Sequence, residues 1–268
     1  MKELRLNQKI LLLQLTNFFL LIISFIYVTI TVEYYWYVLS VLVWFIYCPI
    51  GCGLTLHRLL THRSFEVNSW IENLLSIVSV FSTLGPTIAW VALHRIHHKK
   101  SDTQYDPHTS YINKKFSFKK ASKVIIGYLE KTDNIQIKFV SDLLKKPIHR
   151  FIFNNYFKII LGYIIVLGFI NPLLIIFAYA VPAFLTIIVV GLVNVLGHYH
   201  GYQTYNIDDF SSNSWIANII SFGEGWHNNH HANQTNSYTG EEWWEWDIIG
   251  NIIDIIRIDR GKTYGRKR

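Results

Sequence analysis

The residues most able to do chemistry in this chain are its 12 histidines, because most of them fall into short groups. The groups are His57 and His62 in HRLLTH; His94, His97 and His98 in HRIHH; His198 and His200 in HYH; and His227, His230 and His231 in GEGWHNNHH. Positions i, i+3 and i+4 share one face of a helix, so each His-x-x-His-His triplet can direct three imidazoles to one place. His57 and His62 would lie about 140° apart on a regular α-helix. They must therefore serve different metals, or the helix must unwind between them.

The number and type of these side chains indicate a site for two metals. Imidazole suits iron, zinc, copper and nickel. A zinc site needs three or four ligands, whereas these groups place about nine histidines at positions suited to binding a metal. Cysteine is absent from them, which excludes an iron–sulfur centre; Cys48 and Cys52 lie within an apolar segment and are interpreted as small apolar filler. Two redox metals beside lipid indicate oxygen chemistry on a hydrocarbon, whereas zinc would indicate hydrolysis or a structural role.

Four apolar segments separate and flank these groups. The chain is 51% hydrophobic and 16% charged, whereas a soluble domain carries about 25% charged residues. Crossing a membrane takes about 20 apolar residues. We predict spans at about 10–32, 34–56, 153–170 and 173–196, the last with a kink at Pro182.

The positions of the 25 lysines and arginines predict how the spans are oriented. Three precede the first span, 16 lie between Arg58 and Lys158, and six lie from Arg257 onward, with none in the two short connections. Because basic residues stay on the cytoplasmic side, both termini and the metal site should be cytoplasmic. Two buried helical hairpins in a soluble protein are the alternative, which this asymmetry disfavours.

The predicted fold is therefore an all-α integral membrane protein of one domain, residues 1–268. Four transmembrane helices form two hairpins, and a cytoplasmic helical cap, residues 57–152 and 197–268, holds a histidine-ligated di-metal site. Two further apolar stretches complicate this picture. Residues 70–90 are interrupted by polar residues, glycine and proline, so they are interpreted as an interfacial or re-entrant segment. Residues 247–258 should also lie in the membrane interface.

The motifs HRLLTH, HRIHH, NVLGH and GEGWHNNHH together resemble those of the integral-membrane fatty-acyl desaturases, specifically the delta-9 group that includes stearoyl desaturases. The similarity extends over nearly the whole chain and includes SDTQYDPH at 101–108 and EWWEWD at 242–247. The resemblance implies an O2-dependent enzyme that uses two irons and two electrons to remove two hydrogens from a saturated acyl chain. The product has a cis double bond, expected at the delta-9 position.

The resemblance also implies roles for individual residues. The iron ligands would be His57, His62, His94, His97, His98, His198, His227, His230 and His231, and Asn194 would reach an iron through water. Asp102, Asp106 and Glu224 match acidic positions of the family and would orient imidazoles, the alternative being ordinary solvated acids. Trp90 resembles a tryptophan beside the acyl tunnel, the alternative being an anchor at the membrane interface. His108, His149 and His200 have no ligand partner at the family's spacing and are interpreted as non-ligands.

The identity of the substrate and of the other partners is less constrained. Some acyl-CoA members carry charges just before the second histidine group, whereas Val91, Ala92 and Leu93 stand here. This favours an acyl-lipid substrate over acyl-CoA. We expect a separate electron donor, such as ferredoxin or a small haem cytochrome, and no nucleic acid partner. A related sterol, alkane or carotenoid oxygenase and a non-catalytic membrane metal-binding protein remain as alternatives.

Overall fold

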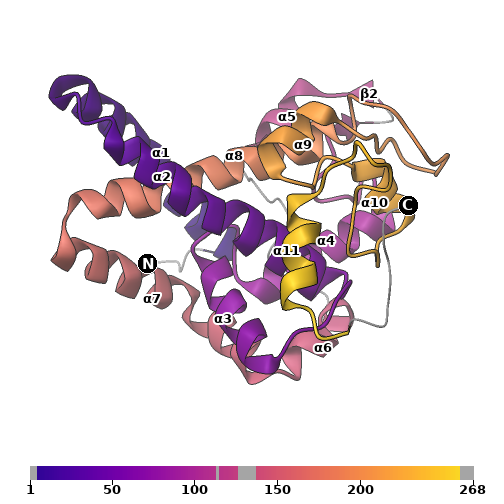
Figure 1. The fold of residues 1–268 in the computed structure, drawn as a ribbon, viewed down its shortest axis with the longest axis horizontal. Helices are drawn as coiled ribbons and strands as arrows, with labels where there is room; N and C mark the ends of the chain where they lie inside the picture. Colours follow the sequence, from indigo (N-terminus) through magenta and orange to yellow (C-terminus); the bar gives the residue numbers. More distant parts are fainter. Residues whose placement is uncertain (1–4, 113–114, 126–136, 260–268) are drawn as a thin grey trace.

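The structure, a computed structural model, describes residues 5–112, 115–125 and 137–259 and is mostly helical (Figure 1). Residues 1–4 and 260–268, which the topology prediction concerns, lie outside the described residues. The helices are α1 Leu6–Thr31, α2 Tyr35–Phe45, η1 Ile46–Thr61, α3 Ser69–Val80, α4 Thr87–Lys100, α5 Phe118–Ile125, η2 Ile137–Phe139, α6 Ser141–Leu144, α7 Pro147–Ile170, η3 Ile175–Ala180, α8 Val181–Leu196, α9 Trp215–Ser221, α10 His227–Ala232 and α11 Ile248–Ile256. One antiparallel pair of two-residue strands, β1 Tyr111–Ile112 and β2 Lys115–Phe116, adds to the predicted all-α architecture.

Four helices are long and apolar enough to cross a membrane, as predicted. They run over Leu6–Thr31, Tyr35–Thr61, Pro147–Ile170 and Ile175–Leu196. In Figure 1 the pairs α1/α2 and α7/α8 extend to the left, and the shorter helices gather on the right. The second candidate span continues past the predicted end at residue 56 and carries His57 at its end. The first group of histidines is therefore positioned directly by a spanning helix.

The second half of that span is wound as a π-helix, η1, over Ile46–Thr61. The His62 N–H donates to the His57 carbonyl oxygen at 3.1 Å, the five-residue interval that defines this winding. Pro49 lies in the first turn of η1, where it has no N–H to continue the α-helical bonding. A wider turn brings residues five apart onto one face, so His57 and His62 point the same way. Of the two alternatives left open for this pair, a departure from α-helical winding is therefore the one that the structure has.

The stretch at 70–90 is two helices rather than one span. The helix α3 has only 12 residues, too short to cross a membrane. The chain then turns through Thr83 at φ 56° and Gly85 at φ 107° before α4 begins. Trp70 and Leu74 of α3 are exposed. This turn redirects the chain so that α4 carries its histidines alongside η1.

The core beneath the histidines is apolar and closely packed. Leu54 and Leu56 of η1 pack with Val91 and Ala92 of α4, and all four are at most 1% exposed. Ile249 and Ile253 of α11 are inaccessible to solvent and belong to the same cluster, whereas Ile255 of α11 is exposed. These contacts fix η1, α4 and α11 relative to one another. The histidines on η1 and α4 therefore stand on a rigid base.

Candidate metal centre

The structure brings nine of the ten grouped histidines together as two adjacent sets. The five-histidine set is His57, His62, His94, His98 and His230, and the four-histidine set is His97, His198, His227 and His231. Within each set, one ring nitrogen of every member lies within 4.8 Å of those of the others. The sets touch, because the rings of His98 and His231 have centroids 4.5 Å apart. Four separate stretches of the chain therefore meet at one centre.

Each His-x-x-His-His triplet serves both sets, which differs from the expectation that a triplet points to one place. On α4, His94 and His98 belong to the five-histidine set and His97 to the other. On a helix, residue i+4 is rotated about 40° one way from residue i and residue i+3 about 60° the other way. The imidazole at i+3, that of His97, is therefore turned towards the four-histidine set. The short helix α10 divides its triplet in the opposite sense, giving only His230 to the five-histidine set.

Four imidazoles are held from behind by carboxylates at Nδ1. Asp106 contacts His97 at 2.9 Å and Asp102 contacts His198 at 2.8 Å. Glu224 pairs with His57 in the same way. A carboxylate at Nδ1 fixes the tautomer and leaves Nε2 free to act as a ligand. The three acids singled out from the sequence all lie behind imidazoles of the two sets.

A fourth carboxylate of this kind, Asp209, was missed in the sequence. Its Oδ2 lies 2.7 Å from Nδ1 of His231. Asp209 belongs to the segment NIDDF, which contains no histidine and lies 22 residues from its partner. Nothing in the sequence distinguishes it from its neighbour Asp208. The pairing is visible only once α10 is placed against this loop.

Burial and the carboxylates set the charge state of the site. Burial lowers the pKa well below its usual value for four imidazoles, His94, His98, His227 and His230, and neighbouring imidazoles add to the effect. Although burial opposes it, the interaction with His97 lowers the pKa of Asp106 to about 2. Neutral imidazole is the form that binds a metal. These four imidazoles are therefore in their binding form at neutral pH, and Asp106 is ionised.

The arrangement of the Nε2 atoms of the histidines fits a bound cation in each set. Nε2 atoms face each other at 2.9 Å between His57 and His230 and at 3.1 Å between His198 and His227. The Nε2 atoms of three more histidines are buried without a partner among the described residues: His62, His97 and His231. Buried polar atoms without partners are costly. A metal ion coordinated by several of these Nε2 atoms would satisfy them.

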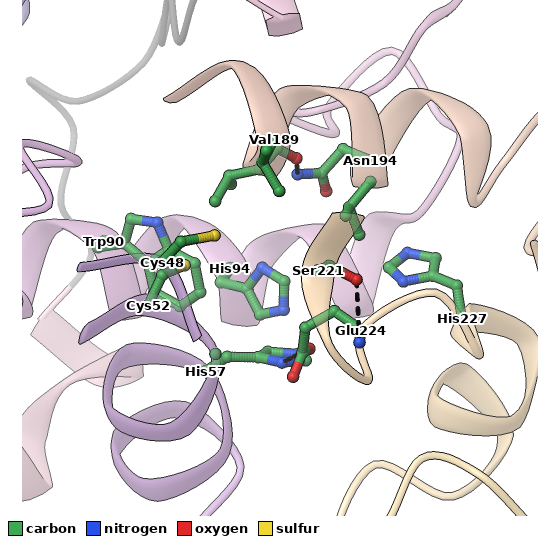
Figure 2. Close-up of a pocket in the computed structure, with 13 residues that line it drawn as sticks. Cys48, Cys52, His57, Trp90, His94, Val189, Asn194, Ser221, Glu224 and His227 are labelled. Atoms are coloured by element: carbon green, nitrogen blue, oxygen red, sulfur yellow. Dashed lines mark hydrogen bonds and ion pairs between the residues drawn. The ribbon is translucent and has the colours of Figure 1, made fainter. Parts of the chain in front are cut away.

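An apolar cavity leads from between the spans to these histidines (Figure 2). Its walls include Cys48, Cys52, Val189 and Val193, and residues of both sets also line it: His57, His94 and His227. The cysteines are buried and free, consistent with their interpretation as apolar filler. A segment of a hydrocarbon chain placed in this cavity, about 40 Å³ in volume, would lie beside both groups of imidazoles.

Trp90 and Asn194 both line this cavity. The Trp90 indole stacks on His94, with centroids 4.7 Å apart and the planes 13° from parallel. Asn194 donates from Nδ2 to the Val190 carbonyl oxygen at 2.8 Å, while its buried Oδ1 has no partner among the described residues. Figure 2 shows Asn194 across the cavity from His57. That free oxygen is available to a water or a metal.

Comparison with known proteins agrees with this arrangement. The model of the fatty acid desaturase family matches residues 34–239, which include all four histidine groups. The chain belongs to the fatty acid desaturase family.

Its relatives in that family act on acyl lipids or on acyl-CoA. The sn-1 stearoyl-lipid 9-desaturase of Anabaena variabilis is 38% identical over 215 residues, 78% of this chain and 76% of the relative. Delta-9 acyl-lipid desaturase 2 of Arabidopsis thaliana is 34% identical, covering 78% of this chain and 68% of the relative. An acyl-CoA 5-desaturase of Anemone leveillei is 33% identical, covering 77% and 64%. The chain is therefore a member of a family of enzymes that act on fatty acyl chains.

In this desaturase-family chain, two arginines, the buried Arg58 and the partly buried Arg95, link the histidine segments to other parts of the fold. Arg58, next to His57, is 1% exposed and contacts Glu224 at 2.9 Å and Asp247 at 2.7 Å. Arg95, next to His94, donates to the Leu60 and Thr61 carbonyl oxygens and pairs with Asp142. The sequence shows only that an arginine follows the first histidine in two groups. The structure shows that each arginine links its own group to another part of the desaturase.

The remaining histidines lie outside both sets of the desaturase centre. His200 is exposed. His149 is buried away from the sets, with Nδ1 3.2 Å from the Thr87 hydroxyl and Nε2 3.2 Å from Glu72. His108 contacts the rings of His94 and His97 but joins neither set. This placement agrees with their interpretation as non-ligands.

Proposed function

We propose that this chain is an O2-dependent di-iron desaturase that introduces a cis double bond, at the delta-9 position, into a saturated fatty-acyl chain. The observation that carries the proposal is the apolar cavity, which imidazoles of both histidine sets line. A saturated chain offers no polar group at the reacting carbons. Selectivity must therefore come from the depth at which the cavity holds the chain.

The nine histidines of the two sets would hold two irons, with Asn194 completing the site through water. Bound iron would supply the O2-dependent redox chemistry that an unactivated C–H bond requires. The carboxylates of Glu224, Asp102, Asp106 and Asp209 would keep Nε2 of their partner imidazoles aimed at the metals. Trp90, stacked on His94, would form part of the wall that the acyl chain contacts, and the apolar walls would exclude water.

The overall reaction consumes one O2, two electrons and two protons for each double bond. The acyl –CH2–CH2– unit is oxidised to –CH=CH–, and O2 is reduced to two molecules of water. Two of the four electrons come from the broken C–H bonds, and the other two come from a separate donor, a ferredoxin or a small haem cytochrome. The substrate is proposed to be an acyl lipid, with acyl-CoA as the alternative.

Residues 1–268 are proposed to form one multi-pass domain with two hairpins of spans. Both termini and the metal centre would face the cytoplasm, because the basic residues are absent from the two short connections between paired spans. The side chains before the second group do not help to identify the head group. Val91, Ala92 and Leu93 are at most 2% exposed, so they cannot contact a CoA or a lipid head group.

Expression in a bacterium without an oxygen-dependent desaturase tests the proposal. Gas chromatography and mass spectrometry of fatty-acid methyl esters should show new monounsaturated chains, and dimethyl disulfide adducts should place the double bond at delta-9. His97→Ala should abolish this product while membrane insertion is unchanged, whereas His200→Ala, at an exposed histidine outside both sets, should retain it.

Two outcomes would contradict the proposal. Hydroxylated chains without any new double bond would indicate one of the related membrane oxygenases. Purified protein that binds zinc but not about two irons per chain would indicate a non-catalytic metal-binding protein.

A further inference from the structure

The five-histidine set has a second open side, away from the acyl cavity. Seven of the nine grouped imidazoles are buried, and only His62 and His98 are partly exposed. Both line one surface cavity of about 390 Å³, which shares no lining residue with the acyl cavity. The centre is therefore reached from two sides by different residues. One approach is lined by apolar side chains and lies between the spans, and the other is lined by Arg95 and Lys99 of α4 among others and lies at the end of η1.

The rim of this second cavity is cationic. Lys99 lies at the end of α4, and its Nζ is 5.8 Å from the centroid of the Phe139 ring, which lines the cavity. The Lys138 Nζ lies 5.3 Å from the same ring. Arg95 also lines the cavity and donates to the Phe139 carbonyl oxygen at 2.6 Å, which holds that loop in place. No acidic residue is among the described residues that line it.

The carboxylate nearest to this rim is already neutralised. Asp142 pairs with Arg95 at 2.8 Å and also with Arg63. The two lysine ammonium groups beside Phe139 therefore present positive charge outward. Opposite charge on a partner would favour docking here, and it would speed the encounter at low salt.

The imidazoles at the cavity also connect to the whole centre. His62 and His98 have ring centroids 4.5 Å apart. His98 in turn lies 4.9 Å from His230 of its own set and 4.5 Å from His231 of the four-histidine set. An electron that arrives at this surface has a path of ring contacts to both sets.

We propose that the cavity rimmed by Lys99, Lys138 and Phe139 is the docking surface for an acidic, one-electron carrier protein, which delivers electrons at the His62 and His98 edges. The inference rests on the proposed desaturase function, because it needs a reaction that consumes electrons. Each double bond requires two docking events, in each of which the carrier is oxidised by one electron. The protons enter from water, as in the balanced reaction above.

The surface is assigned to a protein rather than to the membrane because of its place in the fold. In Figure 1 the end of the molecule that holds α4 and α10 is opposite the end where α1 and α2 join. The acyl chain has its own cavity, lined by other residues. The donor can therefore bind while the substrate stays in place.

Binding of a plant-type [2Fe–2S] ferredoxin, an acidic carrier, to the iron-loaded full chain in nanodiscs tests the proposal. The double variant Lys99→Glu/Lys138→Glu should raise the Kd for ferredoxin about tenfold or more at low salt, with a weaker salt dependence. The matched control Lys115→Glu/Lys119→Glu makes the same charge change at exposed lysines that neither line the cavity nor lie over the Phe139 ring, and it should leave Kd within about twofold. A neutral variant, Lys99→Gln/Lys138→Gln, should fall between wild type and the glutamate variant.

A second readout separates docking from the metal chemistry. Reduction of the iron by dithionite, followed by addition of O2, should give the same product yield in the rim variant as in wild type. An unchanged Kd in the rim variant, or loss of binding to phosphatidylglycerol vesicles instead of ferredoxin, would overturn the docking proposal. A different result would refute the proposed function. In it, the wild-type protein reduced by dithionite forms no double bond, although ferredoxin binding still depends on Lys99 and Lys138.

Discussion

At the scale of single residues, the carboxylates behind the imidazoles do as much to define the centre as the imidazoles themselves. A neutral histidine can carry its proton on either nitrogen, and only one tautomer leaves Nε2 free. The four Nδ1 contacts made by Asp102, Asp106, Asp209 and Glu224 remove that ambiguity for four of the nine rings. These carboxylates therefore orient the imidazoles for metal binding.

Asp209 offers a test of this orienting role, because its chain neighbour provides a matched control. Asp209→Ala removes the carboxylate 2.7 Å from His231 and should weaken iron binding about 10- to 100-fold. Asp208→Ala, at an exposed position one residue away, should leave iron binding unchanged. Iron per chain, measured after dialysis against graded chelator, distinguishes them. Equal iron retention in the two variants would show that the Asp209 contact does not support the site.

At the scale of elements, helix rotation decides which histidine enters which set, and the sequence does not show rotation. The four spans could be predicted because hydrophobic length is a local property. The shared direction of His57 and His62 could not, because it depends on the π-winding of η1. The division of each triplet likewise depends on how α4 and α10 are turned relative to η1.

The position of α10 depends on a close approach between its leading loop and α9. A Cβ placed at Gly225 would lie 2.1 Å from the backbone nitrogen of Asn218, and neither backbone can yield easily. Gly225→Ala should therefore shift α10 and its three histidines, destabilising the fold by about 1–3 kcal/mol and lowering iron content. Gly162→Ala on α7 is the control, since nothing lies within 4 Å of its Cβ.

The glycine control should be neutral or slightly stabilising, because alanine favours a helix over glycine by roughly 0.5–1 kcal/mol. Thermal unfolding in detergent, followed together with iron content, measures both effects. A Gly225→Ala protein with the Tm and the iron content of wild type would mean that the loop can move without carrying α10 with it.

At the scale of the whole molecule, the spans, the short helices and the connecting segments contribute different parts of the site. The spans supply most of the apolar cavity and position the first histidine group, the short helices α4 and α10 supply the two triplets, and the connecting segments supply the carboxylates. The histidine motifs and the apolar lengths were enough to predict that both parts meet. The contacts that join them, such as Arg58 with Asp247 across 189 residues, could not be found without the fold. They link segments that no local pattern relates.

The cavity makes one prediction that depends on this whole arrangement. Cys48 lines the cavity and lies nine residues before His57 on the same continuous span, so it is farther from the centre than Cys52. Cys48→Phe should fill the part of the cavity that receives the methyl end of the substrate. Long chains could then no longer place the reacting carbons at the histidines, and the ratio of 16-carbon to 18-carbon monounsaturated products should rise several-fold. Val41→Phe, at an exposed position on the same span, is the matched control and should leave the ratio unchanged. A Cys48→Phe enzyme with wild-type yield and wild-type ratio would show that the acyl chain does not extend along η1, because a phenyl ring and an acyl chain cannot occupy the same space.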